Sequence, residues 1–504
     1  MDIARREKGI AAFGWYEVVA RPAPGSFGLK QSIRLALGLI LALIAANVLG
    51  HSAMNGAQRT LAIAIVVLSA LPTWLWLSGV DRGHPFMMFM GILYAVYYAI
   101  PLFFMEDFTV GVYDVPITAS HITAALWLAL GGLLCMLAGY YGPQKWLIAA
   151  MVPKFGLRWS NPGALKFTAI LFAVVGLAFF VLTQSVNVPK ALAQITFFTS
   201  DLVLIGSCIL FGLQLMGSLD LGSKLLLWGV IVPVRALLGF GGGAAAAGFL
   251  PVLILLIFYC SITHSAPWKT LLIGFLAVLI VRPLMVPLRM ATWGGQAEGE
   301  SIDTKGIMFA RAGSEMLATG ETPYEYMIQF TLRRLASTMV LTEVMRDTPD
   351  HVPYWNGATF VPILFKPIPR LIWPDKPQEI SGETFGHRYG LLDRNDYYTS
   401  YNLPQVPELY INFGVVGVLI GMFVYGMLYR ASLSLFVHPG MGFGAVVAAA
   451  YVSVLWTDIE SAAGLAFGAL FWGIIFIGLI HLVVEFGELT SAGPALEYGL
   501  ERNA

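Results

Sequence analysis

Three arginines lie within or beside apolar stretches of this chain, where a charged side chain needs a polar partner. Arg235 occurs in Val-Pro-Val-Arg-Ala-Leu-Leu-Gly, Arg282 in Ile-Val-Arg-Pro-Leu-Met, and Arg289 two helical turns further on. The surrounding apolar runs contain no Asp or Glu that would neutralise Arg235 or Arg282. The planar guanidinium fork suits phosphate oxygens, so three such groups at one depth could clamp a diphosphate. The alternative is that each side chain reaches the lipid headgroups.

A second group of cations flanks a tryptophan in the run Pro-Arg-Leu-Ile-Trp-Pro-Asp-Lys-Pro. Arg370 and Lys376 lie on either side of Trp373, and prolines restrict the backbone between them. Cations suit a phosphate and a ring face suits a sugar, so this stretch is a candidate sugar-phosphate site, with Arg370 also a catalytic candidate. The alternative is a surface loop anchored by a buried tryptophan.

Two further side chains could move a proton. His387, which precedes Arg388 in a glycine-punctuated segment, could act as a base or donate to a phosphate, and Arg388 could bind the same anion. The alternative for His387 is a structural role. Glu408 begins an apolar run, where it is either a general base or an acid favoured by the helix dipole. Asp393 and Asp396 fit a solvated turn better than a metal pair, so we predict no metal and no other cofactor.

The frame that positions these residues is apolar. The chain of 504 residues is 57% hydrophobic and 12% charged, with a mean hydropathy of +0.73. Soluble domains are nearer one quarter charged. Apolar runs of roughly twenty residues recur, each long enough to span a bilayer as a helix. The predicted spans lie near residues 31–50, 59–79, 86–105, 119–141, 165–185, 199–217, 223–241, 244–263, 269–288, 409–429, 442–460 and 464–485. We therefore predict an all-α polytopic membrane protein with about 12 transmembrane helices. The net charge of zero gives no indication of a nucleic-acid partner.

Basic residues gather in the loops on one side of the predicted bundle, and acidic residues gather on the other side. The positive-inside rule then places both termini in the cytoplasm and the one long polar segment outside. In that segment, residues 323–346 have helical periodicity and could lie on the outer membrane surface, whereas the proline-rich residues 352–377 predict irregular structure. The predicted organisation is a cytoplasmic tail (1–28), a membrane bundle of about nine spans (29–289), a large extracytoplasmic loop with an amphipathic helix (290–407), about three further spans (408–485) and a cytoplasmic tail (486–504).

Three features together resemble the O-antigen polymerase (Wzy) superfamily, in its oligosaccharide repeat-unit polymerase branch. They are Arg235 before a glycine-rich turn, the tryptophan run followed by Gly-Glu-Thr-Phe-Gly, and Pro-Glu-Leu-Tyr-Ile-Asn-Phe-Gly-Val-Val-Gly at the start of the tenth predicted span. The likeness is specific over residues 362–421 and rests on topology elsewhere. It implies a GT-C-like architecture and a bacterial inner-membrane enzyme whose large loop and active site face the periplasm.

The resemblance also implies a reaction. A metal-independent glycosyltransferase of this kind transfers a growing glycan from undecaprenyl diphosphate onto the next lipid-linked repeat unit. Its expected partners are undecaprenyl-diphosphate-linked oligosaccharides, the lipid bilayer, a chain-length regulator and a flippase. An O-antigen ligase is the nearest alternative and differs in the acceptor. A flippase or transporter of lipid-linked sugars would show paired halves or interrupted spans, and the single asymmetric loop favours an enzyme instead.

Overall fold

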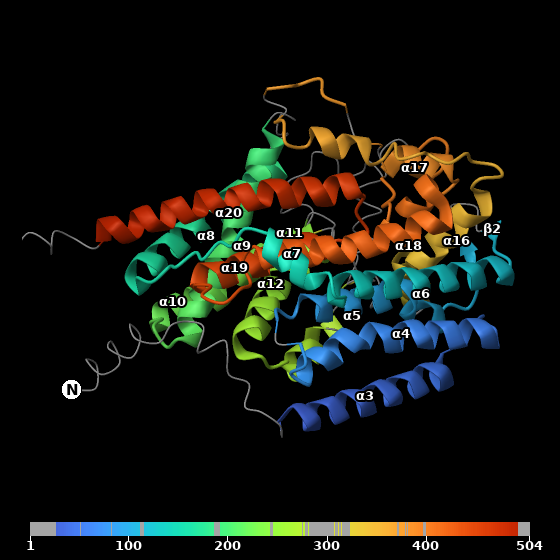
Figure 1. Ribbon diagram of the computed structural model, residues 1–504, viewed down its shortest axis with the longest axis horizontal. Helices are drawn as coiled ribbons and strands as arrows, with labels where there is room; N and C mark the ends of the chain where they lie inside the picture. The colour runs from blue at the N-terminus through green and yellow to red at the C-terminus, as the bar shows by residue number, and fades with distance from the viewer. Residues whose placement is uncertain are drawn as a thin grey trace, which may run out of the picture.

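The computed structural model describes residues 27–50, 52–81, 83–110, 115–185, 192–241, 245–274, 276–277, 281, 307, 311, 314, 323–369, 372–377, 380, 382–396 and 400–491. Almost all regular structure in these ranges is helical (Figure 1). The helices are α3 (Phe27–Leu49), α4 (Gly56–Leu77), α5 (Phe86–Tyr98), α6 (Ala119–Tyr141), α7 (Lys145–Met151), α8 (Pro162–Ser185), α9 (Ala193–Leu215), α10 (Leu221–Leu226), α11 (Val232–Gly241), α12 (Ala245–Thr263), α15 (Pro323–Leu335), α16 (Ser337–Asp347), α17 (Gly382–Arg388), α18 (Gln405–Ser434), α19 (Phe443–Trp456) and α20 (Ala463–Ser491).

Short elements connect them. A 3₁₀ turn, η1 (Ile100–Phe103), follows α5, and a π-helical turn, η2 (Leu227–Ile231), joins α10 to α11. The strands β1 (Thr109–Val110) and β2 (Val115–Pro116) pair antiparallel, with Thr109 opposite Pro116. A second 3₁₀ turn, η3 (Val361–Phe365), is the one regular element described between Val352 and Pro377, which confirms the irregular structure predicted for that stretch.

Eight of the described helices are long and apolar enough to cross a membrane, and three shorter apolar helices lie in α3, α5 and α19. All of them fall where the sequence predicts spans, which confirms an all-α polytopic membrane protein. The predicted ninth span, near residues 269–288, lies largely outside the described residues. The predicted tails, 1–28 and 486–504, are described only from Phe27 and as far as Ser491.

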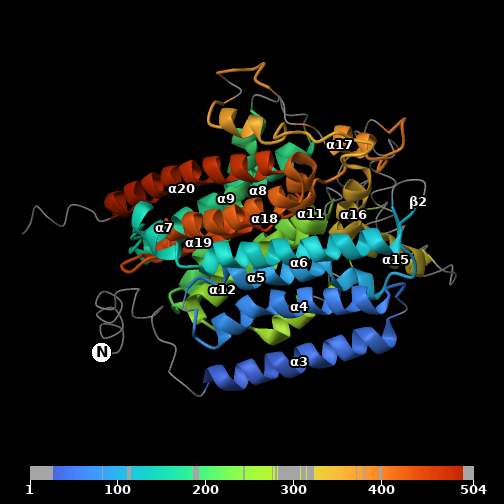
Figure 2. The ribbon, with the colours of Figure 1, turned by 45° about the vertical axis from the view of Figure 1, so that its right-hand side comes forward.

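The helices run roughly parallel or antiparallel to one another, and β1, β2, α16 and α17 gather toward one end of the bundle (Figures 1 and 2). We call this the loop end. Within the bundle, α8 packs along α9, α18 along α6, and α19 between α12 and α20. The helix α19 is buried along nearly its whole length, as expected for a short central helix surrounded by others.

The amphipathic helix predicted over residues 323–346 is in fact two helices, α15 and α16, separated at Ala336. Residues Ser337 to Val344 of α16 are all buried, and α16 packs against α6 and α18. The prediction that this stretch lies on the membrane surface is therefore wrong for α16. Its polar face fits into the bundle through side-chain hydrogen bonds, such as the one that Thr338 Oγ1 donates to the Tyr98 carbonyl at 2.7 Å.

Candidate functional site

The helix α18 contains a reversal. Gly414 has φ 65° and ψ −157°, a conformation that is accessible essentially to glycine alone. Leu409 contacts Gly421, and Phe413 contacts Gly417, so that the two halves lie against each other with Gly414 at the tip. Residues twelve positions apart in a continuous helix would be separated by about 18 Å. We call residues 405–413 the first arm and residues 415–434 the second arm.

Glu408 ties the first arm to α20. Its carboxylate accepts a hydrogen bond from the Ala463 amide at 2.6 Å, at the positive end of the α20 dipole, and its side chain is fully buried. Glu408 therefore lies at a helix N-terminus, as the helix-dipole interpretation predicts. The helix whose N-terminus it contacts is α20, not α18. The Thr359 hydroxyl faces the same carboxyl group.

Asn412 ties the first arm to the polar loop. Its Nδ2 donates to Thr359 Oγ1 and to the Glu408 carbonyl, each at 2.8 Å, while its Oδ1 accepts from the Gly357 amide at 2.9 Å. The Trp355 amide also donates to the Ile411 carbonyl at 2.9 Å. The loop is therefore held on the first arm by buried hydrogen bonds, each worth about 1 kcal/mol net.

Polar atoms inside the two arms lack partners. Gln405 Nε2, Glu408 Oε1 and Tyr425 OH are buried without a hydrogen-bond partner among the described residues. Tyr425 lies within electrostatic range of Glu408, so that these atoms share one interior region. Because buried polar atoms are almost always paired, the group has capacity for water or for a hydroxyl-rich ligand.

A second polar cluster joins α16 to Tyr401, in the segment before α18. Arg346 contacts both Glu343 and Asp347, and Glu343 Oε2 is buried without a partner in the described part of the chain. Burial raises the pKa of Glu343 to about 7, against the opposing effect of Arg346. The Arg334 guanidinium lies 4.7 Å from the Tyr401 ring centroid, and Tyr401 also interacts with Glu343. Burial raises the pKa of the Tyr401 hydroxyl above its usual range.

His387 and Arg388 lie at the end of α17, at the loop end. His387 Nε2 donates a hydrogen bond to the Asp396 carbonyl at 2.8 Å, because a carbonyl oxygen only accepts. Arg388 is exposed and lies 4.9 Å from the ring centroid of Trp355. The proton-acceptor role of His387 and the anion-binding role of Arg388 stay predictions.

The cations of the tryptophan run, Arg370 and Lys376, differ in what the structure shows of them. Lys376 is buried, and its Nζ donates to the Ile368 carbonyl at 2.7 Å, so its charge points into the loop. The contacts of Lys376 describe a cation that stabilises the loop, and the sugar-phosphate role predicted for it stays a prediction. Trp373 is partly exposed and packs edge-on against Phe365 rather than serving as a buried anchor. Arg370 lies outside the described residues, as do Arg282 and Arg289.

Arg235 is buried among partners. Its guanidinium lies 3.9 Å from the Phe180 ring centroid, and its Nη1 donates to the Ala247 carbonyl at 3.2 Å. Asp201 on α9 interacts electrostatically with it, and Asp201 also accepts a hydrogen bond from the Tyr451 hydroxyl at 2.7 Å. The inference that Arg235 has no acidic neighbour is wrong, because the carboxylate comes from a different helix.

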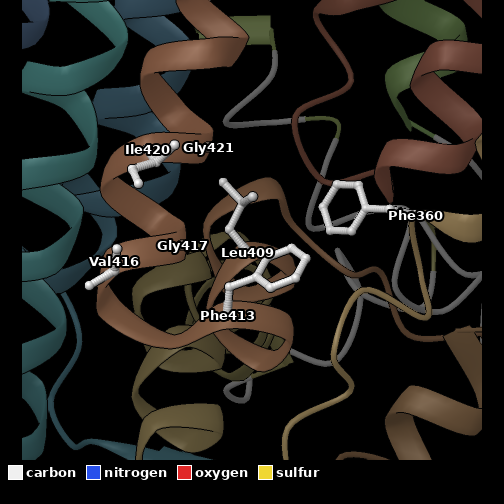
Figure 3. Close-up of a pocket in the computed structure, with 7 residues that line it drawn as sticks. All are labelled: Phe360, Leu409, Phe413, Val416, Gly417, Ile420 and Gly421. Carbon is white, nitrogen blue, oxygen red and sulfur yellow. The ribbon is translucent and has the colours of Figure 1, made fainter.

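An apolar groove runs along α18. Figure 3 shows Leu409 and Phe413 of the first arm beside Gly417 of the second arm, with Phe360 approaching from the loop. The groove has a volume of about 310 Å³. Val416, Ile420 and Gly421 complete its lining, and none of the lining residues has a polar side chain.

Sequence reasoning missed several residues of this arrangement. Three of them are polar or ionisable residues inside helices with mainly apolar neighbours: Asp201, Glu343 and Gln405. A search for every polar residue with such neighbours would have found them. Their partners come from distant segments, so pattern alone could not pair them. Within the described ranges, no group of three or more His, Cys, Asp or Glu is placed to hold a metal ion.

The fold and this site define a polytopic, all-helical membrane protein with a polar loop packed into one end of its bundle. The chain belongs to a family described as a domain of unknown function (DUF8712), whose model matches residues 158–490. The matched region contains α18 with its reversal, α20 and the loop. No curated protein and no solved structure matches the chain.

Proposed function

We propose that this protein is a glycan polymerase of the Wzy type, which transfers a growing glycan from undecaprenyl diphosphate onto a lipid-linked repeat unit. In this proposal the protein lies in a bacterial inner membrane, with the loop end at the periplasmic face. The eight long and three shorter apolar helices, together with the predicted ninth span, would give twelve spans. An even number of spans puts both termini on one side, and the positive-inside rule assigns that side to the cytoplasm.

One observation carries the proposal: the first arm of α18 has an apolar face and a polar face. Leu409 and Phe413 line the apolar groove, while Gln405 Nε2 and Glu408 Oε1 on the same arm are buried without a hydrogen-bond partner among the described residues. A substrate with a hydrocarbon chain and a hydroxyl-rich head would match both faces. The loop that carries the tryptophan run packs on this arm through Asn412 and Thr359.

The chemistry assigned to the site is positioning and charge neutralisation. An acceptor hydroxyl oxygen attacks the anomeric carbon, the bond from that carbon to the diphosphate oxygen breaks, and undecaprenyl diphosphate leaves with the bonding electrons. The hydroxyl proton passes to His387, whose Nε2 donates to the Asp396 carbonyl. Arg388 is the exposed cation beside it, and Arg282, Arg289 and Arg370 remain predicted ligands of the diphosphate.

The experiment is reconstitution. Purified protein in lipid vesicles is given a lipid-linked oligosaccharide repeat unit, and the products are separated by size. Glycans of two or more repeat units, together with released undecaprenyl diphosphate, support the polymerase. His387→Ala should abolish elongation at normal protein abundance, whereas Arg394→Ala, an exposed residue of the same loop, should not. Transfer only to an added non-repeat acceptor would instead indicate a ligase.

A transporter of lipid-linked sugars is the second candidate, and a specific observation favours it. The reversal at Gly414 interrupts α18, and broken helices that line a site are a feature of transporters. The same vesicles distinguish the two functions. Movement of the intact repeat unit between leaflets without elongation would support a transporter and exclude the polymerase.

A further inference from the structure

Five apolar side chains of the loop point away from the protein. We call them the apolar ridge. Two of them, Val361 and Leu364, are three residues apart in η3, a spacing that puts them on one face of a 3₁₀ turn. The ridge consists of Val361 (50% exposed), Leu364 (75%), Ile368 (36%), Ile372 (75%) and Trp373 (37%).

Two lysines of the same stretch, Lys366 and Lys376, point the opposite way, whereas Asp375 is exposed beside the ridge. Lys376 Nζ donates to the Ile368 carbonyl at 2.7 Å and is buried behind the ridge. The aliphatic part of Lys366 lies over Gly468 of α20, so close that a Cβ at Gly468 would meet Lys366 Cδ at 2.9 Å. A loop in water would show the reverse pattern, with lysines outside and isoleucines inside.

The ridge adjoins a helix that is long and apolar enough to cross the membrane. Trp472 Nε1 of α20 donates to the Lys366 carbonyl at 2.9 Å, and η3 packs against α20. Figure 1 shows this part of the loop, in orange, lying beside the N-terminal part of α20. Phe471, Ile475 and Leu479 are exposed apolar side chains further along α20, so the ridge adjoins a helix surface whose composition suits contact with lipid.

We propose that the apolar ridge inserts among the hydrocarbon chains of the adjacent lipid leaflet, as a membrane anchor within the polar loop. Trp373 and Trp472 then lie at the level that tryptophan favours in membranes, between headgroups and chains. Lipid fits better than a second copy of the chain or another protein, because the ridge is continuous with the exposed face of α20. The inference does not depend on the glycan-transfer activity.

The anchor also explains why the groove on α18 has Phe360 as one wall. Phe360 directly precedes the ridge, and it packs against Phe413 with ring centroids 5.7 Å apart. An inserted ridge would hold this wall at the depth of lipid chains. The loop would then be fixed to the bilayer beside the groove rather than extending into solvent.

Photocrosslinking in the native membrane tests the proposal with the full chain. The photoreactive residue p-benzoylphenylalanine replaces Leu364 or Ile372, and adducts are identified by mass spectrometry after irradiation. The same replacement at Leu479, exposed on α20, is the positive control. Replacement of Arg394, exposed in the loop, is the negative control.

We expect lipid adducts at both ridge positions, in a yield similar to that at Leu479 and at least about five-fold above that at Arg394. Adducts to a second copy of this chain or to another polypeptide, without lipid adducts, would overturn the proposal. So would a lipid yield at Leu364 and Ile372 no higher than at Arg394. Using two ridge positions guards against one replacement that disturbs η3.

Discussion

The Tyr429 hydroxyl donates a hydrogen bond to Oε1 of Gln405 at 2.9 Å, although 24 positions separate the two residues within α18. In an uninterrupted helix they would lie about 36 Å apart. The contact is possible because the chain reverses at Gly414. The reversal brings the first residues of α18 back into the bundle. There the backbone N–H of Gln405 also donates to the carbonyl of Ile459, which lies between α19 and α20 in the chain.

Replacing Gly414 with alanine should destabilise the protein. The new Cβ would force φ 65° and ψ −157° on an L-residue and would lie 3.0 Å from the Tyr354 hydroxyl. We expect a loss of about 1–3 kcal/mol, measured as a lower midpoint of thermal unfolding in detergent. Gly478→Ala is the matched control, since nothing lies within 4 Å of a Cβ there. Equal midpoints for the two variants would mean that the reversal carries no backbone strain.

Glu408 should tolerate loss of its charge but not loss of its acceptor. Glu408→Gln keeps a side-chain oxygen for the Ala463 amide, which now lies 2.6 Å from the carboxylate. Glu408→Leu leaves that buried amide unpaired, at a cost of about 1–3 kcal/mol. We expect normal abundance and glycan elongation for Glu408→Gln, and reduced abundance for Glu408→Leu. A folded Glu408→Gln variant without elongation would instead make Glu408 a proton-transfer residue.

The sequence predicts the spans well and the site only in part. Runs of apolar residues specify helices through local composition, so α6 begins and ends where the pattern indicates, at Ala119 and Tyr141. The reversal in α18 depends on one glycine inside an otherwise continuous apolar run, and nothing local distinguishes Gly414 from Gly417. Pairings such as Arg235 with Asp201 join residues of different helices, and periodicity in one helix contains no information about its neighbours.

Lys376 should stabilise the loop rather than bind a ligand. Lys376→Met removes the donor for the Ile368 and Phe365 carbonyls, so we expect about 1–2 kcal/mol of lost stability. Limited proteolysis of the loop, together with the thermal midpoint, measures the effect. Arg394→Met in the same loop is the control, because Arg394 is exposed. A Lys376→Met variant with normal stability but poor elongation would restore the sugar-phosphate interpretation.

Glu343 should make stability depend on pH. Burial raises its pKa from 4.5 to about 7, so between these values the folded state holds the proton more tightly than the unfolded state. The stability that this proton contributes is complete below pH 4.5 and is lost as the pH rises through 7. Glu343→Gln cannot ionise, so its thermal midpoint should exceed that of the natural protein at pH 8, by an amount equivalent to about 1 kcal/mol or more.

At pH 4.5 the two proteins should unfold at similar temperatures. The groups that face Glu343 are Arg346 and Asp347 on α16 and Tyr401 from the segment before α18. Glu106→Gln, at an exposed position, is the control and should show no such difference. A Glu343→Gln midpoint lower than that of the natural protein at pH 8 would show that the pair with Arg346 outweighs burial.

Arg235 and Asp201 should be coupled in stability. Arg235→Met leaves the Asp201 carboxylate with the Tyr451 hydroxyl alone, and Asp201→Asn leaves the buried guanidinium with Phe180 and the Ala247 carbonyl. Arg235 and Asp201 are buried and interact electrostatically, so removing one of them leaves the other charge without this compensation, whereas removing both does not. The double variant should therefore be more stable than the sum of the single effects, by about 0.5–3 kcal/mol.

Thermal unfolding of the four proteins in one detergent gives this coupling energy. A second cycle, between Asp201 and Arg430, is the control, since Arg430 packs over the Tyr140 ring instead. A coupling near zero between Arg235 and Asp201 would leave the guanidinium available to an anionic lipid, in line with a diphosphate clamp. The expected coupling would assign Arg235 to the packing of α8, α9, α11 and α19, and the clamp would then depend on Arg282 and Arg289.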